Sequence, residues 1–137
     1  MADRVEALSR VPLFAGVGRK ELKRFADRMS PRTFTEGEVA VEEGRGGAGF
    51  WLIEEGDATV SIGGDIVRSL GPGDYFGEVA LLDDGPRSAT VTAGTDMRCA
   101  GMAAWEFRPF VLEHPEVALT MLQTLARRLR EAEARSN

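Results

Sequence analysis

The chain has 137 residues, of which 43% are hydrophobic and 28% are charged, a composition typical of one globular domain with a modest core. Its formal net charge of −5 argues against non-specific binding to nucleic acid, whose backbone must be neutralised by cations. The first residues lack the apolar core of a signal peptide, and no apolar run approaches the ~18 residues of a membrane span, so we expect a cytoplasmic protein.

The N-terminal part is expected to form two short helices. Residues 4–9 have helical spacing, with Asp3 in position to cap the helix. Pro12 and the glycines after it break this helix, and residues 19–29 return to helical spacing. The second helix has an apolar stripe that we expect to belong to the core, formed by Leu22, Phe25, Ala26 and Met29.

After these helices the apolar period changes to two, which is typical of strands. Strands are expected at residues 32–35, 39–41, 50–53, 58–62, 66–70, 88–93 and 97–102. Gly63-Gly64 is a two-residue hairpin signal. Residues 44–49 form a glycine-rich loop without the Lys-Ser/Thr pair of a P-loop, so we interpret it as a connection. Short strands separated by close turns predict an antiparallel barrel or sandwich.

The segment that most constrains function is residues 76–91, here called the cassette segment. Gly77 lets the backbone approach a ligand closely, and residues 78–81 favour a short helix whose first N–H groups attract an anion. Arg87 can bind the same anion through two hydrogen bonds, and Glu78 offers a carboxylate that suits sugar hydroxyls. Either residue alone would suggest only a surface ion pair, but the ordered set predicts a binding site.

This ordered set resembles the phosphate-binding cassette of cyclic nucleotide-binding domains. That family includes catabolite-activator-type transcription factors, regulatory subunits of the cyclic-AMP-dependent protein kinase, and nucleotide-gated channels. The matching motifs are Phe-Gly-Glu-Val-Ala-Leu-Leu at 76–82 and Pro-Arg-Ser-Ala-Thr-Val at 86–91. The resemblance implies that Glu78 binds the ribose 2′-hydroxyl, while Arg87 and backbone amides bind the cyclic phosphate. The ligand contacts that it implies are Phe76, Gly77, Glu78, Val79, Ala80, Arg87, Ser88 and Ala89.

The expected ligand is cyclic AMP first and cyclic GMP second, with no metal. Ser88 resembles the activators, in which this hydroxyl helps to hold the phosphate of cyclic AMP, whereas threonine there is associated with guanine. Activators also place hydroxyl side chains late in their last helix to meet adenine. Ala132 and Glu133 stand at those positions here, so the helix lacks these contacts to the base.

The resemblance runs from about residue 8 to residue 130 and implies an eight-stranded antiparallel jelly-roll barrel with flanking helices. We expect a single cyclic-nucleotide-binding domain over residues 1–137. Its expected parts are N-terminal helices in 1–30, a barrel in 31–103 that contains the cassette segment, and C-terminal lid helices in 104–135. The chain ends without room for a helix-turn-helix domain, so we expect no DNA binding and an output through a protein effector or a fused module.

Residues 116–135 are the longest expected helix. Its apolar residues repeat at alternating spacings of four and three, which gives a heptad-like seam of Ala118, Leu122, Leu125, Leu129 and Ala132. The seam fits two arrangements, packing on the barrel or pairing with the same helix of a second copy. In activator-type relatives the helix covers the nucleotide and forms a homodimer. The arginines at 127, 128 and 130 are interpreted as a solvated face rather than a DNA patch.

No nucleophile–base pair, acid pair or metal cluster stands out, so an enzyme is not expected. Cys99 is the single cysteine and His114 the single histidine, which is too few for a usual zinc site or a metal-dependent cupin. We interpret Cys99 as a buried small residue, His114 as a polar loop residue before proline, and the pair Asp83-Asp84 as a turn. Three hypotheses follow: a cyclic-nucleotide sensor that relays binding through its last helix, a degenerate dimerisation or docking module, and a cupin-type enzyme.

Overall fold

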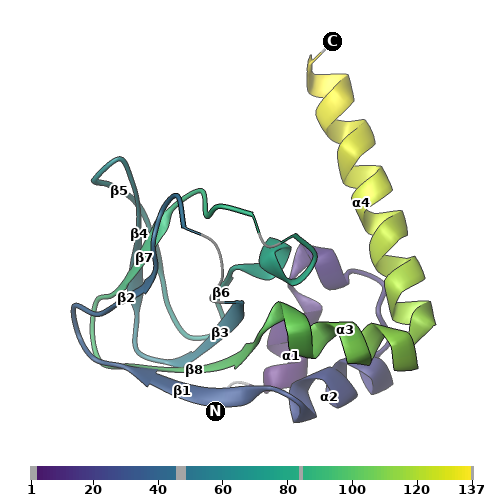
Figure 1. Cartoon of the computed structure of the whole chain (residues 1–137), viewed down its shortest axis with the longest axis horizontal. Coiled ribbons are helices and arrows are strands. Elements are labelled where there is room, and N and C mark those ends of the chain that lie inside the picture. The colour runs from purple at the N-terminus through teal and green to yellow at the C-terminus, as the bar shows by residue number, and fades with distance from the viewer. Residues whose placement is uncertain (1–2, 46–48, 84, 137) are drawn as a thin grey trace.

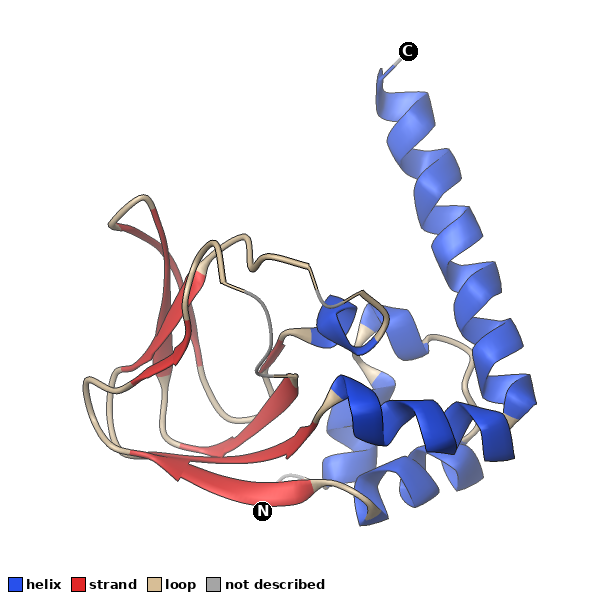
Figure 2. Ribbon diagram, viewed as in Figure 1, coloured by secondary structure: helices blue, strands red, loops and turns tan. Residues whose placement is uncertain are grey.

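The computed structural model of the chain describes residues 3–45, 49–83 and 85–136. The strands gather in one half of the molecule and the helices in the other, and the last helix extends away from both (Figures 1 and 2). The cassette segment lies where the two halves meet.

The N-terminal helices are α1 (Arg4–Ser9), the 3-10 helix η1 (Pro12–Phe14) and α2 (Arg19–Asp27). The predicted cap of α1 is confirmed, because the Asp3 side chain accepts a hydrogen bond from the Val5 amide at 3.0 Å. Helix α2 ends two residues earlier than expected, yet Met29 is still buried with the rest of the predicted stripe.

Within the described residues, eight antiparallel strands form two sheets, which confirms the jelly-roll prediction at the level of strand number and direction. The strands are β1 (Ser30–Phe34), β2 (Val39–Val41), β3 (Phe50–Glu55), β4 (Ala58–Ile62), β5 (Asp65–Leu70), β6 (Tyr75–Phe76), β7 (Thr90–Ala93) and β8 (Met97–Met102). Their order is β1-β8-β3-β6 in one sheet and β2-β7-β4-β5 in the other. The sheets do not join into a closed barrel: each has a short edge strand, β2 or β6, and the fold is a jelly-roll-like sandwich.

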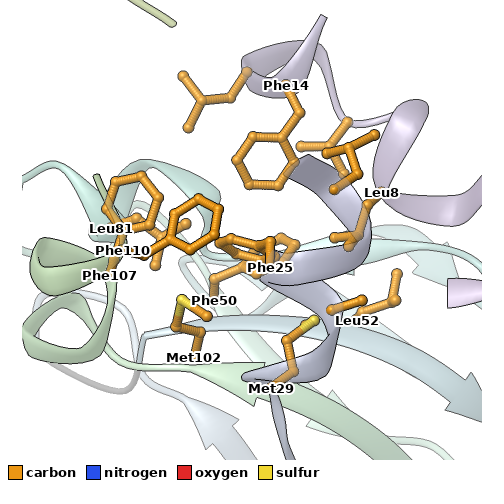
Figure 3. Close-up of a cluster of buried hydrophobic side chains, with 14 of the residues drawn as sticks. Leu8, Phe14, Phe25, Met29, Phe50, Leu52, Leu81, Met102, Phe107 and Phe110 are labelled. Carbon is orange, nitrogen blue, oxygen red and sulfur yellow. The ribbon is translucent and has the colours of Figure 1, made fainter. Parts of the chain in front are cut away.

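Alternation along the strands divides the core into two clusters. In β3, Phe50 and Leu52 face the helices, whereas Ile53 belongs to the cluster between the sheets. Phe25 of α2 is central to the helical cluster (Figure 3). The aromatic rings around Phe25 lie 5.0–6.1 Å away in edge-to-face arrangements and belong to Phe14, Phe50, Phe107 and Phe110. This cluster fixes the helices against the sheet that carries β6, from which the cassette segment begins.

The C-terminal helices are α3 (Ala104–Glu113) and α4 (Pro115–Ser136). The face of α4 that packs on the body is Val117, Met121 and Thr124, and the Thr124 hydroxyl donates a hydrogen bond to the Ala15 carbonyl at 3.3 Å. Of the two arrangements left open for the heptad-like seam, packing within the chain is not found for Leu122 and Leu129, which are 63% and 61% exposed, whereas Leu125 packs against the helical cluster. Pairing of the seam with a second copy stays a prediction. Two neighbouring faces of α4 have residues at alternating spacings of four and three. The face that contacts η1 and α3 is the one that begins at Val117, one residue before the predicted seam.

Candidate functional site

The cassette segment begins where β6 ends. Gly77 has a φ of 83°, in the left-handed region that favours glycine, and it precedes the 3-10 helix η2 (Glu78–Leu81). The Ala80 amide donates a hydrogen bond to the Gly77 carbonyl at 3.0 Å. The predicted short helix is thus a single 3-10 turn, and the Ala80 amide, which the resemblance places near the phosphate, bonds within that turn.

The Arg87 side chain is held against the loop between β2 and β3. Its Nη2 donates a hydrogen bond to the Gly49 carbonyl at 2.7 Å. Its backbone N–H donates to the Arg45 carbonyl at 2.9 Å, and its carbonyl accepts from the Gly44 amide at 2.8 Å. The guanidinium also lies beside Gly77, where a Cβ would come within 2.5 Å of Arg87 Nη1. The glycine-rich loop that we interpreted as a plain connection thus supports the cassette segment; its residues 46–48 lie outside the described residues.

One cavity of about 480 Å³ contains all eight of the residues predicted to contact a ligand. Their binding role stays a prediction, but the folded chain brings them to one place. Sequence reasoning missed the wall contributed by the strands, formed by Val41, Val60, Arg68, Tyr75 and Val91. The period-two pattern of these segments predicted that they form strands. It did not predict which strands pair with one another, and that pairing brings their side chains to the cavity. Of the adjacent aspartates, Asp83 lines the cavity and Asp84 lies outside the described residues.

The cavity combines two arginines, carboxylates and several apolar side chains. Glu78 is half-buried, and its charge together with burial of the ring raises the pKa of Tyr75, with burial the larger cause. Charges on Arg128 of α4 and Arg68 of β5 act on the same hydroxyl in the opposite direction. Such a set suits a small molecule with an anionic group, a hydroxyl-bearing ring and an apolar face.

A larger hollow of about 650 Å³ lies between α1 and α2. Three of its cations are paired with acids: Arg4 with Glu54, Arg19 with Asp3, and Lys23 with Asp27. These exposed or partly exposed pairs leave little uncompensated charge for a ligand. We therefore place the site in the smaller cavity, where a polar set converges on an apolar wall.

Other titratable groups offer little chemistry. Cys99 is fully buried, as expected, and burial raises the pKa of its thiol to about 12. His114 is more buried than expected of a loop residue, with 13% side-chain exposure and its ring 4.9 Å from that of Phe110. Within residues 3–45, 49–83 and 85–136, no three His, Cys, Asp or Glu residues are grouped to hold a metal ion. No helix in these ranges is long and apolar enough to cross a membrane.

Comparison with known proteins gives the same family from sequence and from structure. A family model described as "Cyclic nucleotide-binding domain" matches residues 31–114, more than half of the chain. A cAMP-dependent protein kinase regulatory subunit from Yarrowia lipolytica is 39% identical over 78% of this chain and 30% of its own length. A CRP-like cAMP-activated global transcriptional regulator from Mycobacterium tuberculosis is 29% identical over 91% of this chain and 58% of its own. The chain thus spans less than a third of the kinase subunits.

Among solved structures, the N-terminal domain of a transcriptional regulator from Streptomyces coelicolor A3(2) superposes with a TM-score of 0.83 at 30% identity. The superposition covers 92% of this chain and 94% of that domain. Thermus thermophilus Catabolite Activator Protein superposes with a TM-score of 0.69 at 31% identity, over 90% of this chain and 61% of its own. The match to the first of these therefore includes nearly the whole fold.

Proposed function

The chain belongs to the family of cyclic nucleotide-binding domains, and from this membership we propose that it binds a cyclic nucleotide in the cassette cavity and acts as a sensor. The observation that carries the proposal is that Gly77, Glu78 and Arg87 line one cavity with an apolar wall. The relatives are regulatory subunits and transcription regulators, which supports regulation rather than catalysis.

In this proposal Arg87 binds the cyclic phosphate through charge-assisted hydrogen bonds, and Glu78 accepts from the ribose 2′-hydroxyl. Ser88 adds a hydroxyl beside the phosphate, while Phe76, Val79, Ala80 and Ala89 shape the cavity. Cyclic AMP is the first proposed ligand and cyclic GMP the second. The similar kinase subunits are cAMP-dependent and the similar CRP-like regulator is cAMP-activated, which supports that order.

Helix α4 is the proposed output element. Its Arg128 acts electrostatically on the Tyr75 hydroxyl, and Tyr75 lines the cavity. In the proposal, the ligand has different affinities for different positions of α4, and that difference shifts the population of these positions. We propose that a protein effector or a fused module reads the position of the helix.

A homodimer through α4 is part of the proposal. Leu119, Leu122 and Leu129 are 58–63% exposed on this helix, where a second copy would cover apolar surface. The same surface supports the alternative function, a family member that binds no nucleotide and serves in dimerisation or docking. Calorimetry separates the two, because the alternative predicts a dimer without saturable binding of any cyclic nucleotide.

The direct test is calorimetric titration of cyclic AMP into the wild-type chain and into Arg87→Ala. We expect saturable binding by the wild type and a loss of about 2–5 kcal/mol in the variant, because a phosphate in the cavity loses its cationic partner. Arg98→Ala is the matched control: Arg98 is a strand arginine paired with Glu55 and is not among the cavity residues. Equal binding by Arg87→Ala and the wild type would contradict the site.

A further inference from the structure

The N-terminal helices carry a positive charge on a negatively charged protein. Residues 3–28 contain seven Lys or Arg and four Asp or Glu, a net charge of +3 in a chain whose net charge is −5. The other residues therefore have a net charge of −8. Two of the seven cations, Arg19 and Lys20, stand in the first turn of α2, where the helix dipole disfavours positive charge. Helix stability therefore does not account for them.

The hollow of about 650 Å³ between α1 and α2 lies on this positive part of the chain. No described residue lines both this hollow and the cassette cavity. In Figure 1, α1 and α2 lie at the lower side of the view, whereas the free end of α4 is at the upper side. The hollow combines cations, two carboxylates and two apolar side chains. Its lining residues are Arg4, Arg19, Lys20, Lys23, Asp3, Asp27, Val5 and Ala26.

The cations at the rim of the hollow are available to a partner that brings several carboxylates. Lys20 is exposed and makes no ion pair within the part of the chain that the structure describes. Two other cations pair with acids of the hollow, Arg19 with Asp3 and Lys23 with Asp27. These four side chains are 47–74% exposed, and exposed pairs contribute little to stability. A small anion meets little uncompensated charge here, whereas a segment with several carboxylates can replace both weak pairs and bind Lys20 as well.

The surroundings of the hollow favour a short acidic segment over an extended polyanion. Nucleic acid or an anionic membrane would extend beyond the hollow to the rest of the chain, whose net charge of −8 repels it. The apolar stripe of α2, which includes Leu22 and Phe25, is buried in the core. Helix α2 therefore offers no apolar face to a lipid surface.

We propose that the hollow between α1 and α2 binds an acidic segment of a protein effector. Carboxylates of the segment form ion pairs with Arg19, Lys20 and Lys23. An aliphatic side chain between these carboxylates contacts Val5 and Ala26. The inference goes beyond the proposed function, because this surface is separate from the cassette cavity and needs no nucleotide.

The test measures the fluorescence anisotropy of a fluorescein-labelled peptide, Glu-Asp-Leu-Leu-Asp-Glu, titrated with the full chain. We expect Lys20→Glu/Lys23→Glu to bind it at least about tenfold more weakly than the wild type, because two attractive contacts become repulsive. High salt should weaken binding by the wild type, since exposed charges are screened. Arg127→Glu/Arg130→Glu is the matched control, which reverses two exposed charges at the same spacing on α4 and should bind as the wild type does. The uncharged peptide Gln-Asn-Leu-Leu-Asn-Gln should not bind.

A second measurement needs no substitution. Lys20 and Lys23 are the only lysines in the sequence, and both line the hollow. Acetylation of each lysine by acetic anhydride, followed by mass spectrometry, therefore reports on the hollow directly. The acidic peptide should slow the acetylation of both lysines relative to that of the N-terminal amine.

The inference is overturned if the wild type binds neither peptide, if it binds both equally, or if the two charge-reversal variants lose the same affinity. It is also overturned if vesicles that contain phosphatidylserine, and not the acidic peptide, bind the wild type. Calorimetry of cyclic AMP with Lys20→Glu/Lys23→Glu should match the wild type, so this inference and the proposed function can fail independently. Both lysines are exposed, so the variant should fold, and circular dichroism checks this.

Discussion

At the scale of single residues, Gly77 has two independent reasons to be glycine. Its φ of 83° costs about 1–2 kcal/mol for any residue with a Cβ. In addition, a Cβ would clash with the Gly49 carbonyl and come within 2.5 Å of Arg87 Nη1. We therefore expect Gly77→Ala to lower the free energy of unfolding by more than the backbone cost and to weaken nucleotide binding, because Arg87 must move.

Gly37 provides the matched control for this prediction. Its φ of 86° is nearly the same, but nothing lies within 4 Å of the position of a Cβ. Gly37→Ala should thus show only the backbone cost in urea denaturation and should bind nucleotide as the wild type does. Equal loss of stability in the two variants, or normal binding by Gly77→Ala, would mean that the contact with Arg87 does not matter.

Cys99 gives a prediction about alkaline pH. The unfolded thiol ionises near its ordinary pKa of 9.0, whereas burial raises the pKa in the folded state to about 12. The unfolded state therefore loses its proton first, and stability declines as the pH rises above about 9, by at most ~1.4 kcal/mol per pH unit from this group. Between pH 8 and 10.5, the urea midpoint of Cys99→Ala should fall less than that of the wild type. An equal or steeper fall in the variant would refute this assignment.

At the scale of elements, apolar period and turn residues were enough to place most helices and strands. The stripe on α2 and the hairpin between β4 and β5 both appeared where local signals predicted them. Where two faces of a helix carried equal local signals, the sequence left the choice between them open. On α4 two neighbouring faces have apolar residues at helical spacing, and only contact with η1 and α3 decides that Met121, not Leu122, is buried.

The choice of face on α4 can be tested by truncating one residue. Met121 is 2% exposed in the helical core cluster, so Met121→Ala should cost about 2–5 kcal/mol through lost burial and a residual cavity. Leu112→Ala on α3 is the control, because Leu112 is 80% exposed and its truncation should change stability by less than about 0.5 kcal/mol. Urea denaturation measures both. Similar effects in the two variants would show that α4 is not anchored by this face.

At the scale of the whole molecule, the site consists of a contiguous part and a part assembled by the fold. The cassette segment was predictable because the eight residues expected to contact a ligand lie between 76 and 89, so their chemistry could be recognised in one motif. The wall formed by the strands was not predictable from the sequence, because Val60 and Arg68 reach the cavity through the pairing of strands. The hydrogen bond from Arg87 to Gly49 joins residues 38 positions apart, so no local sequence pattern predicts it.

The exposed end of α4 carries the last prediction. Every described residue from 126 to 136 is exposed, so this part of α4 lacks burial against the rest of the chain. An isolated helix of such length is marginal in water, and a second copy packed along it would supply the missing contacts. Leu122 and Leu129 lie one heptad apart on the same face. We therefore expect the wild type to sediment as a dimer, and Leu122→Glu/Leu129→Glu to sediment as a monomer because paired leucines become like charges.

Leu112→Glu is the control for the dimer, since it places the same charge on an exposed leucine of α3 and should leave the dimer intact. Leu122 and Leu129 are 63% and 61% exposed in the single chain. Their replacement should therefore preserve the fold of the monomer and nucleotide binding at the cassette cavity. Sedimentation at several concentrations measures the association. A monomeric wild type at tens of micromolar, or a double variant that still dimerises, would remove α4 as the interface and leave its exposed leucines for a different partner.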